Sequence, residues 1–80
     1  MKIQKAVAIR LSKLLEEKKM SRYALCRKIA MNESTIYNII NERCKSINLN
    51  TLYLICEGLD MTIIEFLNDD IFEKENLELY

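Results

Sequence analysis

Proline, tryptophan and histidine are absent from this 80-residue chain, and glycine occurs only once. Because proline and glycine mark turns and loops, their scarcity disfavours sheets, long loops and disorder and favours helices with short connections. No stretch approaches the roughly 20 uncharged apolar residues of a membrane span. Arg10 and Lys13 interrupt the N-terminal apolar run, so it does not resemble a signal peptide. We therefore expect a cytoplasmic protein.

The three cysteines, without a histidine, disfavour a zinc site. Cys26 and Cys56 are expected to fill small buried positions on apolar helix faces. Cys44 lies in a polar stretch, where exposure and a redox role stay open. The chain has no Gly-rich phosphate loop and no base partner for Cys44. The sequence therefore predicts no enzyme activity, metal, cofactor or small-molecule ligand.

Half of the residues are hydrophobic, which is enough for one compact all-α domain at this length. We expect the domain to span residues 1–70, followed by an acidic tail over 71–80 that is either frayed or a packing or dimerisation segment. Apolar residues recur at helical spacing. They predict five helices, over residues 4–19, 21–29, 32–41, 49–57 and 62–67.

Several residues are typical of helix ends. Ser21, Asn32 and either Asn48 or Asn50 are expected to cap the second, third and fourth helices. Thr62 and Glu65 form a capping-box pattern before the fifth helix. Gly58, the one glycine, is expected to end the fourth helix in the left-handed conformation.

The stretch from residue 21 to residue 41 predicts two short helices joined by a tight turn. Leu25, Ile29, Met31, Ile36 and Ile39 would form the apolar patch that the two helices share. The other face of the second of these helices would then be polar. Such a small helix with a polar outer face suits the DNA major groove.

The formal net charge is zero, yet the charges are separated along the chain. Residues 1–45 hold eleven basic and four acidic residues, a net charge of +7. Residues 46–80 hold one basic and eight acidic residues, a net charge of −7. A basic half would meet phosphates while the acidic half faces away, although the same pattern also serves solubility.

Two segments resemble the lambda-repressor-like, Cro/cI-type helix-turn-helix family, also called the xenobiotic-response-element (XRE) family. They are MSRYALCRKIAMNESTIYNIIN and LNTLYLICEGLDMTIIEFL, and the resemblance extends over about residues 5–68. The resemblance implies a compact five-helix domain, with the helix-turn-helix in helices two and three. It also implies a DNA-binding regulator of transcription that is usually dimeric.

The family's functional positions map onto residues of this chain. The positions implied to contact bases are Asn32, Glu33, Ser34, Thr35, Tyr37 and Asn38. The resemblance also implies phosphate contacts at Arg22 and Asn41, and the position of Ser21, Arg43 and Lys45 beside them suggests further phosphate contacts there. Arg22 stands where the family often has a glutamine. Glu33 either accepts a hydrogen bond from cytosine or simply complements the helix N-terminal dipole.

The chain also departs from the family pattern at three positions. Ala30 replaces a frequent glycine in the turn, at a cost of about 1 kcal/mol if its backbone is left-handed. Glu42 replaces a frequent glycine after the third helix, and Ile47 replaces a loop proline. These changes affect the shape of the loop that carries Arg43 and Lys45.

The favoured interpretation is a sequence-specific DNA-binding regulator, a repressor that reads a pseudo-palindromic operator as a homodimer through its fifth helix and tail. The alternative is a protein-interaction module on the same fold, such as an antitoxin or an anti-repressor. Glu33, Glu42 and the zero net charge keep this alternative open.

Overall fold

The computed structural model describes residues 1–79, so the predictions that involve Tyr80 lie outside the described residues. These residues form five α-helices and two short 3-10 turns and contain no strand, which confirms the all-α prediction. The elements are α1 (Ile3–Glu17), α2 (Arg22–Ile29), α3 (Glu33–Ile40), α4 (Leu49–Gly58), α5 (Ile63–Leu67), η1 (Asp70–Phe72) and η2 (Lys74–Asn76). None of the helices among residues 1–79 combines the length and apolar character that crossing a membrane requires.

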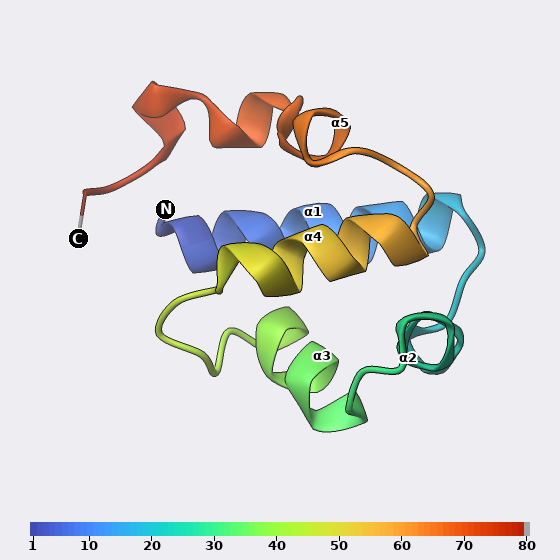
Figure 1. Cartoon of the computed structure of the whole chain (residues 1–80). Coiled ribbons are helices and arrows are strands. Elements are labelled where there is room, and N and C mark those ends of the chain that lie inside the picture. Colours follow the sequence, from blue (N-terminus) through green and yellow to red (C-terminus); the bar gives the residue numbers. More distant parts are fainter. Residues whose placement is uncertain (80) are drawn as a thin grey trace.

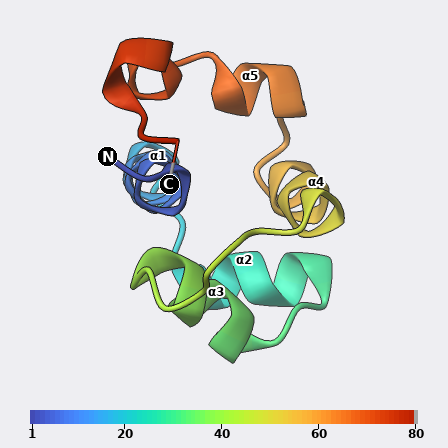
Figure 2. The same cartoon turned by 90° about the vertical axis from the view of Figure 1, so that its left-hand side faces the viewer.

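The helices are arranged around a single core (Figure 1). Viewed end on, α1 and α4 flank the middle of the molecule, with α2 and α3 on one side and α5 with the 3-10 turns on the other (Figure 2). The contacts agree, since α3 packs on α1, α2 packs on α4, and α5 and η1 pack on α4 and α1 respectively. The helix-turn-helix and the acidic C-terminal segment therefore lie on opposite sides of the molecule.

The core confirms most of the predicted apolar stripes. Leu11, Leu25, Ile36, Ile55 and Phe66 are completely buried, and Cys26 and Cys56 fill small core positions as expected. Helical spacing predicts that Leu49 shares one buried stripe with Leu52, Ile55 and Cys56, but this prediction was wrong because Leu49 is 69% exposed. Leu52, one turn later, takes the inward position, while Leu49 borders an open hollow beside Ile3 and Leu67.

The predicted caps are present. The Ser21 hydroxyl accepts a hydrogen bond from the Ala24 amide at 3.1 Å, and the Asn32 side chain accepts one from the Ser34 amide at 2.9 Å. Asn48, rather than Asn50, caps α4, because its side chain accepts a hydrogen bond from the Asn50 amide. Thr62 and Glu65 make both hydrogen bonds of the capping box, each 3.0 Å long.

Four non-glycine residues close the turns between helices with a left-handed backbone: Lys19, Ala30, Glu42 and Asp60, with φ between 52° and 57°. Lys19 explains why α1 ends at Glu17, two residues earlier than expected. The prediction that Gly58 would be left-handed was wrong, because Gly58 is helical and Asp60 takes that conformation. Gly58 instead lies buried against α2.

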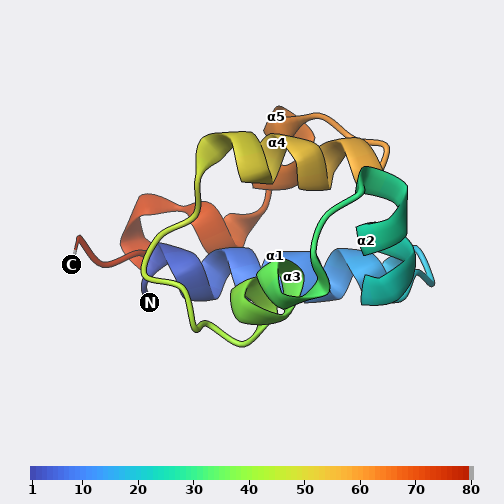
Figure 3. The ribbon, with the colours of Figure 1, turned by 60° about the horizontal axis from the view of Figure 1, so that its bottom comes forward.

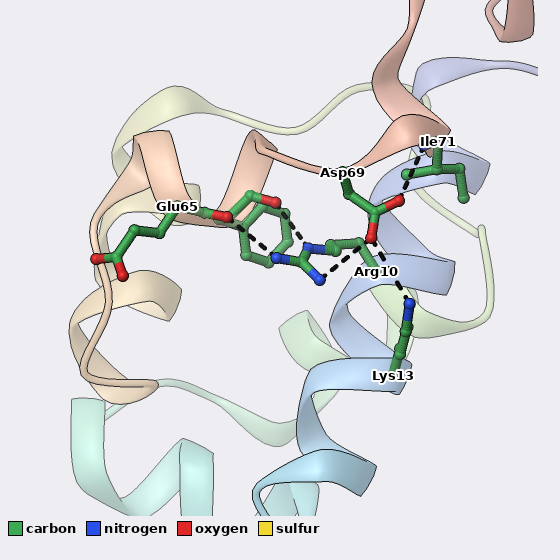
Figure 4. A network of polar contacts seen from close by, with 6 residues as sticks. Arg10, Lys13, Glu65, Asp69 and Ile71 are labelled. Carbon is green, nitrogen blue, oxygen red and sulfur yellow. Dashed lines mark hydrogen bonds and ion pairs between the residues drawn. The ribbon is translucent and has the colours of Figure 1, made fainter.

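The C-terminal segment is tied to α1 through Arg10 (Figure 4). The Arg10 guanidinium donates to the backbone carbonyls of Phe66 and Glu65 at 2.8 and 3.0 Å, and to the Asp69 carboxylate at 3.3 Å. Lys13 lies 3.7 Å from the same carboxylate. Phe72 packs against the core beyond this network. The start of the acidic tail thus lies against the body of the domain.

Candidate nucleic-acid interface

The helix-turn-helix presents α3 on the outside of the molecule (Figure 3). Leu25 of α2 and Ile36 of α3 are completely buried between the two helices and the core, and Ile29 and Met31 pack against the same core. These contacts use the inner face of α3. Its outer face is therefore available for a ligand.

Most of the residues predicted to contact bases are on this outer face. Glu33, Ser34, Tyr37 and Asn38 are exposed. Asn32 is exposed too, but its side-chain oxygen is occupied by Ser34, whose amide and hydroxyl both donate to it at 2.9 Å. Thr35 is half-buried and lines, together with Asn38, a shallow hollow between α3 and the loop that follows it. Glu33 and Asn38 are consequently the most available polar side chains, and the Ser34 hydroxyl keeps its capacity to accept a hydrogen bond.

The predicted phosphate contacts lie around this face. Arg22 is the first residue of α2, directly after the Ser21 cap, and Arg43 follows the left-handed Glu42 beyond α3. The Asn41 side chain donates one amide hydrogen to the Tyr37 carbonyl at 2.9 Å, and the second hydrogen of the same NH2 group can donate to a phosphate. Lys45 is exposed, and the Gln4 side chain donates to its backbone carbonyl. No local pattern in the sequence indicates this link between α1 and the loop after α3.

Tyr37 connects two of the basic residues. The guanidinium carbon of Arg22 lies 5.3 Å from the centre of the Tyr37 ring, and that of Arg43 lies 5.4 Å from it. The guanidinium carbon of Arg22 also lies 5.8 Å from the centre of the Tyr23 ring. Tyr23 was not among the predicted site residues, although it directly follows Arg22 in the sequence. A shallow hollow of about 240 Å³ is lined by Arg22, Glu33, Ser34 and Tyr37. This hollow joins the start of α2 to the start of α3.

The ion pairs in the described part of the chain lie away from the outer face of α3, so they do not neutralise the basic residues beside it. Arg10 and Lys13 pair with Asp69, and Lys28 pairs with Asp60 at 2.7 Å, all away from the outer face of α3. Among residues 1–79, Arg22, Arg43 and Lys45 form no ion pair. Buried apolar residues thus position the helices, while unpaired cations and polar side chains line the outer surface, as binding to a polyanion requires.

A family model for the Cro/C1-type HTH DNA-binding domain matches residues 10–70. The chain belongs to this family. The Cro/C1-type assignment confirms the resemblance drawn from the sequence, and it makes the protein a helix-turn-helix DNA-binding protein.

Solved structures of similar fold include the restriction-modification controller protein C.Esp1396I. The wild-type structure is 23% identical, with a TM-score of 0.71 over 80% of this chain and 82% of that one. A point mutant of the same protein, also 23% identical, matches over 100% of both chains with a TM-score of 0.78. A structure described as the C.Esp1396I nucleoprotein complex has the same identity and TM-score over 98% of this chain and 97% of that one. No curated protein matches this chain.

Proposed function

We propose that this Cro/C1-type protein is a sequence-specific regulator of transcription, a repressor that reads operator DNA as a homodimer with α3 in the major groove. The observation that carries the proposal is the exposed polar face of α3 bordered by Arg22 and Arg43, neither of which has an ion-pair partner among residues 1–79. The nucleoprotein complex of C.Esp1396I, a controller protein of similar fold, supports DNA as the partner.

Direct readout would depend mainly on Glu33, Ser34 and Asn38. An asparagine side chain can pair with adenine in the major groove, and a carboxylate can accept a hydrogen bond from cytosine N4. Asn32 and Thr35 would contribute less to base contacts, because one is engaged in capping and the other is half-buried. The remaining candidates, Ser21, Arg22, Asn41, Arg43 and Lys45, would hold the phosphate backbone.

The exposed apolar residues of α5 and α4 support a dimer. Ile64 is 80% exposed, and Leu67 lies one turn further along α5. Leu49 and Tyr53 are exposed one turn apart on α4, and Leu49 lines a hollow with Leu67. Because large apolar side chains gathered on one surface favour burial against a partner, we assign the dimer contact to α5 and the adjoining residues of α4. Such a dimer would read two half-sites about 34 Å apart.

The first test is binding to random-sequence duplex DNA over a range of salt concentrations, followed by selection of the bound sequences. We expect log affinity to fall with log salt by about 0.9 for each phosphate neutralised, and the selected sequences to be pseudo-palindromic. Absence of salt-dependent binding would overturn the proposal and favour a protein-interaction module.

A pair of variants tests which residues contact bases and which contact phosphates. Asn38→Ala should weaken binding to the selected operator by about 1–3 kcal/mol and leave binding to random DNA nearly unchanged. Arg22→Ala should weaken binding to both kinds of DNA alike. Equal losses on operator and random DNA for Asn38→Ala would show that Asn38 is not a base reader.

The dimer is tested by Ile64→Asp, with sedimentation equilibrium as the measurement. Ile64 is 80% exposed, so the monomer fold should tolerate the change while the dimer dissociates. Leu79→Asp is the matched control, because Leu79 is 93% exposed near the end of the tail. An Ile64→Asp protein that remains dimeric would exclude α5 as the contact, and dissociation of Leu79→Asp would bring the tail into it.

A further inference from the structure

We propose that Tyr37 is a positioning residue, whose ring holds the guanidinium groups of Arg22 and Arg43 together so that their phosphate contacts are made as a unit. This inference rests on the proposed function. It assigns to Tyr37 a role different from the direct base contact that the sequence predicts for it.

The geometry joins three residues from separate parts of the chain. Arg22 begins α2, Tyr37 lies in the second turn of α3, and Arg43 follows the turn that ends α3. The two guanidinium carbons lie at nearly equal distances from the Tyr37 ring centre, 5.3 and 5.4 Å. Both distances fall within the range of about 6 Å in which a cation is attracted to an aromatic ring.

The physical effect of the ring is to restrict two flexible cations. An exposed arginine loses rotamer freedom when it binds a phosphate, and this lost entropy weakens the contact. A ring beside each guanidinium reduces the number of rotamers that the free protein samples, so less freedom remains to be lost on binding. The attraction of both cations to the ring also offsets part of the repulsion between them.

The position of Tyr37 fits this role better than base reading. Tyr37 is 38% exposed, and two arginines lie within cation–π distance of its ring. Glu33 and Ser34, which carry polar groups suited to base contacts, border the hollow beside it at the start of α3. The ring face is thus engaged within the protein.

The test is a double-mutant cycle on random-sequence DNA, measured as affinity over a series of salt concentrations. Tyr37→Leu removes the ring and should weaken binding about tenfold, because both arginines then lose more rotamer freedom when they bind phosphates. It should also reduce the salt slope by about 1 for each arginine released. Arg43→Ala should then weaken binding less in the Tyr37→Leu protein than in the wild type. Tyr37→Phe, which keeps the ring, should retain the wild-type salt slope.

Tyr23→Leu is the matched control. Within residues 1–79 the only cation in cation–π range of the Tyr23 ring is Arg22, at 5.8 Å, so Tyr23→Leu should leave the effect of Arg43→Ala at the wild-type value. Thermal unfolding of each variant identifies any that fail to fold. The contact of both arginines with the Tyr37 ring is also tested without DNA. The ring should shift the NMR signals of the Arg22 and Arg43 side chains, and Tyr37→Leu should abolish those shifts.

The outcomes separate the inference from the proposed function. Suppose that the wild type binds random DNA, that Tyr37→Leu has the same salt slope, and that the effects of Tyr37→Leu and Arg43→Ala simply add. This result would overturn only the role of Tyr37. A loss confined to operator DNA, in both Tyr37→Leu and Tyr37→Phe, would make Tyr37 a base reader. Side-chain NMR signals of Arg22 and Arg43 that are identical in the wild type and in Tyr37→Leu would show that the ring does not hold the two guanidinium groups, whether or not DNA binds. Failure of the wild type to bind any DNA would overturn the proposed function itself.

Discussion

Gly58 on α4 faces Leu25 on α2 so closely that a Cβ atom added at Gly58 would stand 2.5 Å from the Leu25 Cδ1. The same Cβ would stand 2.7 Å from the Cγ2 of Ile29. Gly58 is helical and has no positive φ, so the chain requires glycine here for space and not for backbone freedom. This close approach holds the first helix of the helix-turn-helix against α4.

We expect Gly58→Ala to lower the free energy of unfolding by about 1–2 kcal/mol. Alanine favours the helix by up to about 1 kcal/mol, but overpacking a core costs about 1–3 kcal/mol. Leu25→Ala removes the closer of the two clashes and leaves the one with Ile29, so Gly58→Ala should be less destabilising in that background than in the wild type. Denaturant unfolding of the two single variants and the double variant measures this difference. Additive effects would mean that the two side chains do not compete for the same space.

Ala30→Gly should stabilise the protein by about 0.5–1 kcal/mol. Ala30 has a φ of 52°, where a Cβ costs about 1–2 kcal/mol, and the greater freedom of glycine in the unfolded chain cancels part of the gain. Ala24→Gly is the matched control, because Ala24 is exposed within α2 and glycine there should destabilise by roughly 0.5–1 kcal/mol. Thermal unfolding distinguishes the two, and destabilisation by both variants would contradict the left-handed strain at Ala30.

Acid should destabilise the fold through three carboxylates. The Ile71 amide lowers the pKa of Asp69, the Lys28 ammonium lowers that of Asp60, and the Thr62 backbone lowers that of Glu65. Since each group binds its proton less readily when folded, its stabilisation is present above the unfolded pKa of about 4 and is lost as the pH falls through the folded value. We expect the free energy of unfolding to decrease below about pH 5.

Asp69→Asn should make this pH dependence shallower, because one carboxylate with a lowered pKa is removed. The matched control is Asp70→Asn, since within residues 1–79 the Asp70 side chain takes part in no hydrogen bond or ion pair. Urea unfolding at a series of pH values gives the number of protons taken up on unfolding. An Asp69→Asn protein with the wild-type pH dependence would show that Asp69 does not contribute to acid unfolding.

The three thiols should differ in reactivity. Burial raises the pKa of Cys56 to about 11 and is also the main cause of the raised pKa of Cys26. Since the thiolate is the reactive form, both should resist iodoacetamide in the folded protein at pH 8. Cys44 is only partly buried against the core, although more enclosed than its polar loop suggests, and should be alkylated first. Mass spectrometry of native and urea-unfolded samples gives the order, and early labelling of Cys56 would indicate local opening of α4.

The N-terminal ends of α2, α3 and α5 were predictable because each signal is local. A side chain such as Ser21, Asn32 or Thr62 needs only the amide two or three residues later, and the structure contains all three hydrogen bonds. The apolar stripes were predictable for a similar reason, since helical spacing alone puts Leu25 and Ile36 on inner faces. Leu49 shows the limit of this reasoning, because spacing does not reveal where a helix extends past the core.

The sequence by itself determined the helix-turn-helix, its caps and the residues on the outer face of α3, because helical periodicity and capping act within a few residues. Only the tertiary structure decided which residues meet across helices. Gly58 meets Leu25, Arg10 joins α1 to the C-terminal segment, and Arg22 reaches Tyr37. These contacts depend on how whole helices pack, and packing is set by the summed shape of all the buried side chains, which no short stretch of sequence contains.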